Sequence, residues 1–438
     1  MPVSKRRKPK KQRKKAVKHP AADRVEVGSR PRVIGSFSLF NPRPLHEPWF
    51  AEETEAILAE SERDWLDWYD GSEFEDLEAR AGNRVGEVML RRGESDLSSG
   101  NSFVPWFAHL AKAASMRSLK LREEGEESWL GPACLLFGLS GIAPSSVGKQ
   151  TAAAVGRVRK ALDRDGWPPG LDLTLNERTE TTGRAWTAQD AYGDQFAVVV
   201  ETSGEDLEEP RLLLVSVEMG ANNVATYAAQ AADPEQALAF WRRHVGASAG
   251  DAELRPVAGG EDLWFLAYLT DPADIAWELH KRPIYSHYFE AQRRLEDLVA
   301  HLERRGAPVP AALDLFATDV EPDFEPFMDY LMEQHPEIDE NEAGGTAFAV
   351  IQEWLTDTAP PTRYSASPRR VRSRSLLLFD LNQEVPYFKE VTASWVRYCA
   401  ERAGLDERWT EAAVAAVPSS RDEAMRFETG FEPPADSG

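Results

Sequence analysis

Cysteine is scarce in this sequence, and long apolar runs are absent. The 438 residues include only two cysteines, Cys134 and Cys399, which lie far apart. This usage excludes a disulfide framework and favours a reducing, cytoplasmic setting. The most apolar stretch, residues 132–143, is too short to span a membrane, so we expect no membrane partner. No apolar segment follows the basic N-terminus, and we therefore expect no secretion signal.

Lysine is also scarce, except in one short segment. Residues 1–18 contain ten basic residues and no acid, which leaves 41 basic against 73 acidic residues in the remaining chain, a formal charge of −32. Ten like charges without an apolar face cannot offset the entropy of ordering, so we expect residues 1–35 to be a disordered tail and lead. The residues that we expect to bind a polyanion are Lys5, Arg6, Arg7, Lys8, Lys10, Lys11, Arg13, Lys14, Lys15 and Lys18.

The stretch GIAPSSVGKQT at residues 141–151 resembles a phosphate-binding loop but does not match its motif. Such a loop needs two glycines separated by four residues, followed by Lys and then Ser or Thr. Here six residues separate the glycines, a proline removes one backbone donor, and Gln150 takes the metal-binding position. We expect instead a helix that Ser145 or Ser146 caps and that Gly166 ends.

Four carboxylates accompany the expected central strands: Asp190, Asp194, Glu201 and Glu218. A metal-dependent hydrolase or nuclease needs acids on adjacent strands and a nearby lysine, but residues 164–280 contain no lysine. Asp190 and Asp194 are more simply turn residues, which bond to the local backbone. We therefore predict no metal site and no cofactor, and keep the hydrolase as an alternative.

The histidines do not suggest a zinc site. His280, His287 and His301 are separated by seven and fourteen residues, whereas two ligands on one helix need a spacing of three to five. The sequence also lacks a Gly-x-Ser-x-Gly nucleophile motif. No catalytic residue can be named from the sequence.

Hydrophobic periodicity predicts an α+β fold. Apolar residues recur at helical spacing in the N- and C-terminal regions, while short runs rich in β-branched and aromatic residues between them predict an antiparallel β-meander. Asp233 and Pro234 are suited to begin a helix that covers this sheet. The expected organisation is a basic tail and lead (1–35), a helical domain (36–170), an α+β domain (171–270), a helical domain (271–417) and a flexible acidic tail (418–438).

Two segments carry a family resemblance. Residues 185–218 place the turn Tyr192-Gly193-Asp194-Gln195 before paired strands, and residues 395–405 have the sequence WVRYCAERAGL. Both segments resemble an uncharacterised family of actinobacterial proteins. Because this family has no established activity, the resemblance implies no catalytic residue.

A second basic cluster consists of Arg369, Arg370, Arg372 and Arg374, with serines between them. Arginine forks can clamp phosphates in pairs of hydrogen bonds. The simpler interpretation, which we favour, is that these arginines offset neighbouring acids and help to begin a helix or strand at residues 376–379.

These patterns indicate an intracellular, non-catalytic interaction protein whose basic tail contacts nucleic acid or another polyanion. Two alternatives remain open. One is the metal-dependent hydrolase or nuclease that uses the central carboxylates. The other is a tail that acts as a self-regulatory arm on the protein's own acidic body. The sequence names no protein partner.

Overall fold

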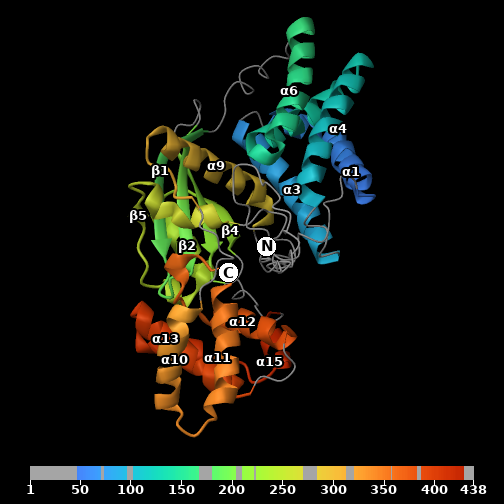
Figure 1. Ribbon diagram of the computed structural model, residues 1–438. Helices are drawn as coiled ribbons and strands as arrows, with labels where there is room; N and C mark the ends of the chain where they lie inside the picture. Colours follow the sequence, from blue (N-terminus) through green and yellow to red (C-terminus); the bar gives the residue numbers. More distant parts are fainter. Residues whose placement is uncertain are drawn as a thin grey trace, which may run out of the picture. The chain divides into compact units, whose positions relative to one another are not determined.

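The computed structural model confirms the α+β fold (Figure 1). It describes residues 47–70, 74–95, 102–166, 180–203, 210–220, 223–269, 284–311, 320–356, 358–381 and 386–428. The ten expected polyanion-binding residues of the tail lie outside these ranges, as does His280. The described chain has helices at both ends and an antiparallel sheet between them.

The sheet is the predicted meander with one strand added. Its order is β4-β3-β2-β1-β5, and each neighbouring pair is antiparallel. The two-residue strand β5, which the sequence did not predict, pairs with β1 at the edge. The strands are β1 (Glu180–Gln189), β2 (Gln195–Ser203), β3 (Arg211–Glu218), β4 (Val224–Ala231) and β5 (Arg255–Pro256).

Both faces of the central strands are buried, in two different cores. Side chains alternate along a strand, so Ala197 and Val199 of β2 face one side while Val198 and Val200 face the other. The first face packs against the predicted covering helix α8 (Pro234–Val245), whose Trp241 is fully buried. The second face shares its core with the N-terminal helices and with α9 (Tyr288–Arg304). Burial on both sides explains why β2 and β3 are almost continuously apolar.

Helix α8 begins at the residues that the sequence predicted. Asp233 accepts a hydrogen bond from the backbone N–H of Gln236 at 2.8 Å, and Pro234 occupies the first turn. Proline lacks an N–H, which is no loss at a position where that donor has no helical partner. Gly246 then ends the helix.

The N-terminal helices surround one apolar helix. This helix, α5, contains most of the apolar stretch 132–143 and is buried along nearly all of its length, as expected for a helix that is apolar on every side. None of the helices in the described ranges has the length and apolarity that a bilayer crossing demands. The N-terminal helices are α1 (Trp49–Arg63), α2 (Trp65–Asp70), α3 (Phe74–Ser95), α4 (Phe103–Glu123), α5 (Leu130–Ile142) and α6 (Ser145–Asp165).

The stretch that resembles a phosphate loop joins α5 to α6. Helix α6 begins at Ser145 and is followed by Gly166 as predicted, but the expected serine cap is wrong. Pro144 occupies the cap position, and Ser145 instead donates its hydroxyl to Glu296 of α9 at 3.0 Å. A long-range partner has replaced the local one.

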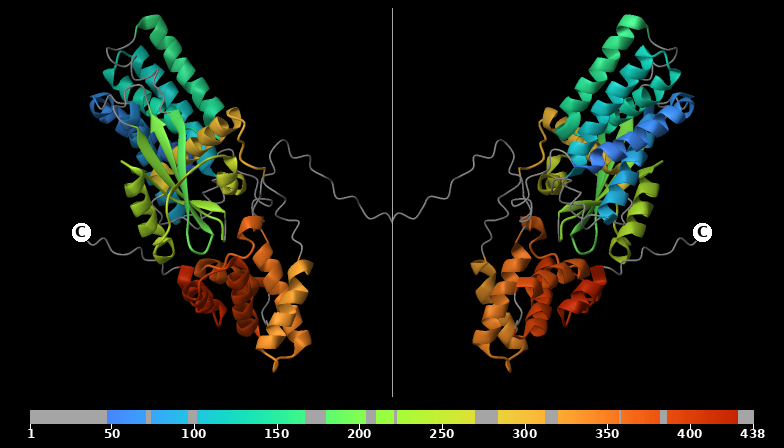
Figure 2. Two further views of the ribbon diagram at one scale, coloured as in Figure 1. Left: turned by 90° about the vertical axis from the view of Figure 1, so that its left-hand side faces the viewer. Right: turned by 90° about the vertical axis from the view of Figure 1, so that its right-hand side faces the viewer.

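The C-terminal helices pack together as one group (Figures 1 and 2). They form their own core around Trp395. Residues 376–379 continue a helix that starts at Pro368. A short helix also lies at 421–428, where the sequence suggested no regular structure; Arg421 pairs there with Asp380 at 2.5 Å. These helices are α10 (Glu321–Gln334), α11 (Glu340–Leu355), α12 (Pro368–Leu381), α13 (Phe388–Ala403), α14 (Glu407–Val414) and α15 (Arg421–Glu428).

Replacing Trp395 with Ala should destabilise the protein strongly. Its side chain is 0% exposed and packs against the rings of Phe327 and Tyr398. We expect a loss of about 3–5 kcal/mol in the free energy of unfolding, measured in urea, because the substitution leaves a cavity. Phe348→Ala, at a site that is 47% exposed in the same helical region, is the matched control. Equal losses in the two variants would contradict a buried role for Trp395.

Candidate functional site

The second basic cluster lies in the first half of α12, and half of it points inward. Arg370 and Arg374 are 0% and 4% exposed, whereas Arg369 and Arg372 are partly exposed. Arg374 pairs with Glu353 of α11 at 3.4 Å. Arg369 pairs with Glu218 at the end of β3 at 3.1 Å. The cluster therefore connects the sheet to the C-terminal helices, and only two of its members can meet a ligand from solvent.

Arg370 holds three backbone segments together. Its guanidinium donates to the carbonyl oxygens of Trp354 at 2.8 Å, Thr362 at 2.5 Å and Ser365 at 3.2 Å. It also lies 4.8 Å from the centre of the Trp354 ring. Burial, together with the charge of Arg374, lowers the pKa of Arg370 to about 9, although nearby carboxylates act in the opposite direction. A guanidinium with this many acceptors fixes the start of α12 against the end of α11.

Three of the four predicted carboxylates gather at one end of the sheet, next to α12. Asp190 and Asp194 flank the turn between β1 and β2, and Glu218 ends β3. Asp190 makes the turn bonds expected of it: its Oδ1 accepts the backbone N–H groups of Gly193 at 2.9 Å and of Asp194 and Gln195 at 3.2 Å. The turn interpretation of Asp190 thus has a direct structural basis.

Asp194 is the most unusual acid of this group. It is 1% exposed, and both of its carboxylate oxygens lack a hydrogen-bond partner of ordinary geometry. Burial, together with the charges of Asp190 and Glu218, raises the pKa of Asp194 to about 8, although Ser367 and Arg370 act in the opposite direction. Gly220 is required beside it, because a Cβ there would lie 2.4 Å from Oδ2 of Asp194. The acid therefore carries a proton at neutral pH.

This geometry does not suit metal-dependent hydrolysis. Asp194 and Glu218 are each 1% exposed, so neither carboxylate can reach a substrate or a metal-bound water from solvent. Glu201 lies near the other end of β2, where it pairs with Arg184 at 2.9 Å. Within the described ranges, no three His, Cys, Asp or Glu side chains are grouped as metal ligands. The arrangement instead suits a buried junction between the sheet and α12.

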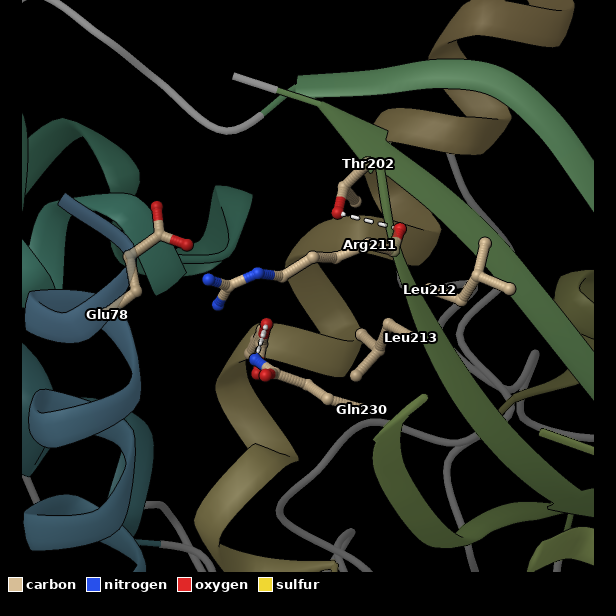
Figure 3. Close-up of a pocket in the computed structure, with 7 residues that line it drawn as sticks. Glu78, Thr202, Arg211, Leu212, Leu213 and Gln230 are labelled. Carbon is tan, nitrogen blue, oxygen red and sulfur yellow. Dashed lines mark hydrogen bonds between the residues drawn. The ribbon is translucent and has the colours of Figure 1, made fainter. Parts of the chain in front are cut away.

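A second polar cluster lies between α3, the sheet and α9 (Figure 3). The side chain of Arg211 points from β3 towards Glu78 of α3, above Gln230. The cavity measures about 20 Å³, room for a water molecule rather than a substrate. Seven residues line it: Glu78, Thr202, Arg211, Leu212, Leu213, Gln230 and Glu290.

Ion pairs fill the interior beside this cavity. Arg294 of α9 is 2% exposed and pairs with Glu78. Burial alone would raise the pKa of Glu290, but its hydrogen bond with His287 and the charge of Arg294 lower it below the ordinary value. His287 is thus committed to Glu290, with Nδ1 and Oε2 separated by 3.0 Å. The cluster fixes α9 to α3 and serves the fold.

Gly141, the first glycine of the apparent phosphate loop, belongs to this cluster. A Cβ at this position would lie 2.0 Å from Oε1 of Glu78. The glycine therefore admits the carboxylate that holds Arg294. Sequence reasoning missed Glu78 and Arg294 because they lie 216 positions apart and neither belongs to a motif. The one available signal was a glycine inside an apolar helix.

Arg370→Ala should be far more destabilising than Arg372→Ala, although both remove an arginine from the same helix. The first substitution leaves the carbonyl oxygens of Trp354, Thr362 and Ser365 buried without their donor. We expect a loss of about 3–5 kcal/mol for Arg370→Ala and less than about 1 kcal/mol for Arg372→Ala, measured by chemical denaturation. Similar losses would show that Arg370 does not hold the junction.

Asp194→Asn should change how stability depends on pH. The pKa of Asp194 is about 8 in the folded protein, against an ordinary value near 4 in the unfolded chain, so the folded state keeps a proton that the unfolded state releases. This acid therefore lowers stability progressively as the pH rises from about 4 to about 8. Urea unfolding at a series of pH values should show that the free energy of unfolding of the variant increases relative to that of the wild type as the pH rises. A constant difference across the range would contradict the raised pKa.

No protein-family model matches this chain, and no curated protein or solved structure is significantly similar to it. The resemblance of residues 185–218 and 395–405 to actinobacterial proteins stays a prediction. The function must therefore be argued from the chain's own charges and contacts.

Proposed function

We propose that the protein is an intracellular, non-catalytic interaction protein whose basic N-terminal segment binds nucleic acid or another polyanion. The observation that carries this proposal is the segregation of charge: residues 1–18 hold ten basic residues and no acid, in a chain of net charge −22. Clustered lysine and arginine bind phosphate backbones by releasing condensed counterions, without a folded recognition surface.

The described body supports this division of roles. Many of its arginines are bound to acids, including Arg84 to Glu60, Arg363 to Asp323 and Arg397 to Glu411. The rest of the chain beyond residue 18 has 41 basic and 73 acidic residues, so it repels a polyanion. The basic segment is the part of the chain suited to attract one.

The opposing charges set the expected strength of binding. The segment offers phosphate contacts but no base-reading element, so binding should show little sequence preference. Affinity for duplex DNA should fall in the non-specific range, with a Kd of about 10⁻⁴ to 10⁻⁶ M at physiological salt. The logarithm of affinity should fall with the logarithm of salt concentration with a slope of about −0.9 per neutralised phosphate.

Deleting residues 1–18 should abolish binding to a fluorescently labelled duplex DNA. The melting temperature should stay nearly unchanged, because ten like charges without an apolar face are not expected to join a hydrophobic core. The matched control is the full chain with Arg369→Gln and Arg372→Gln, the two partly exposed arginines of α12, which should bind as the wild type does. Binding that survives the deletion but is lost in the control would place the contact on α12. Absence of binding in the wild type would refute the proposal.

A further inference from the structure

The helical hairpin of α10 and α11 has an unusual surface. Residues 306–362 contain 13 acids and neither lysine nor arginine. Eight of the acids on the hairpin are exposed: Glu321, Glu325, Asp329, Glu333, Glu337, Asp339, Glu340 and Glu342. Two arginines from outside the hairpin pair with its acids, Arg363 with Asp323 and Arg374 with Glu353. The hairpin is the acidic counterpart of the basic segment.

An apolar seam runs between these two helices. Phe348 of α11 is 47% exposed, and its ring centre lies 6.0 Å from that of Phe324 on α10. Met328 lies one turn after Phe324 and approaches Gly344. A Cβ added at Gly344 would lie 3.9 Å from Cε of Met328. Phe324 and Met328 are themselves only partly buried. We call Phe324, Met328 and Phe348, with the exposed acids Glu325, Asp329 and Glu333, the acidic seam.

The charge around Phe348 distinguishes it from the other exposed apolar side chains. Within the described residues, Leu66, Leu90, Met116 and Leu377 are also exposed. Each of those four has an arginine within three positions along the chain. Phe348 has no lysine or arginine within fourteen positions. An apolar surface on a hairpin that has acids but no lysine or arginine fits a basic chain with some apolar character.

We propose that the acidic seam binds the chain's own N-terminal segment, residues 1–18, in competition with the polyanion. That segment supplies ten cations and no acid, and it also carries Met1, Val3 and Val17. The tether is long enough, because the 28 residues from 19 to 46 can span up to about 90 Å. A compact body of about 400 residues has a radius of gyration of only about 20 Å.

This inference rests on the proposed function and adds its regulation. The same ten cations cannot neutralise phosphates and the acidic seam at once, so each ligand weakens the other. A tethered segment meets the seam at a high effective concentration, which lowers the apparent affinity for a polyanion. Only a polyanion dense enough to outcompete the seam would then release the segment.

The test uses the full chain and a zero-length carbodiimide, which joins lysines to carboxylates in contact. We expect cross-links from Lys5–Lys18 to Glu325, Asp329 and Glu333, fewer of them in Phe348→Ala, and their loss in excess duplex DNA. Mixing the protein with an isotope-labelled copy identifies the chain that supplies the segment. Cross-links mainly between light and heavy chains would overturn docking within one molecule. Cross-links spread equally over Glu124, Glu126 and Glu127 would overturn a specific site.

A matched pair of triple variants gives the second readout. Glu325→Gln, Asp329→Asn and Glu333→Gln together should raise the affinity for labelled duplex DNA about tenfold, which corresponds to about 1.4 kcal/mol. The control Glu124→Gln, Glu126→Gln and Glu127→Gln changes the net charge equally at exposed sites near the end of α4. An equal increase in DNA affinity in both triple variants would show that general charge repulsion causes the effect. It would refute a specific role of the acidic seam. If no variant binds DNA, the proposed function fails, and the cross-links still decide whether the segment docks.

Discussion

Burial of β2 and β3 on both faces is the constraint from which the architecture follows. A strand whose successive side chains enter two cores needs a layer on each side, and the two layers come from different parts of the chain. Helix α8 follows β4 directly and covers one face. The other face is covered by α9 and the N-terminal helices, so the chain must return to the sheet after a long excursion.

Two buried charge clusters fix helices beside the sheet, and each depends on an arginine. Arg294 pairs with Glu78 beside the sheet's inner face, and Arg370 binds backbone carbonyls near Asp194. Buried charges cost desolvation energy unless they are fully paired, so they add more to the uniqueness of an arrangement than to its stability. Asp194 escapes part of this cost by keeping its proton. Acids and arginines that looked like candidates for chemistry are thus used to position helices.

Sequence reasoning succeeded wherever the cause was local. Asp233 and Pro234 fix the start of α8, and the β-branched runs fix β2 and β3, because each signal acts within a few residues. It failed where a residue far away in the sequence determines what a side chain or a glycine contacts. Ser145 bonds to Glu296 rather than capping its helix, and Gly141 accommodates Glu78. For the candidate site, the turn role of Asp190 was predictable, but the inward direction of Arg370 was not, since a run of arginines carries no sign of which ones are buried.

The distribution of charge along the chain is a separate constraint, since folding does not require it. The body could be equally stable with lysines spread over its surface, because surface charges contribute little to stability. Instead, residues 1–18 hold ten basic residues and no acid, and the hairpin with the exposed Phe348 holds acids but neither lysine nor arginine. Such separation makes the attraction between the two segments long-ranged and sensitive to salt, since the Debye length is about 8 Å at physiological ionic strength. Salt therefore weakens both the contact with a polyanion and the contact with the seam, and the balance between them depends on which offers the denser array of negative charge.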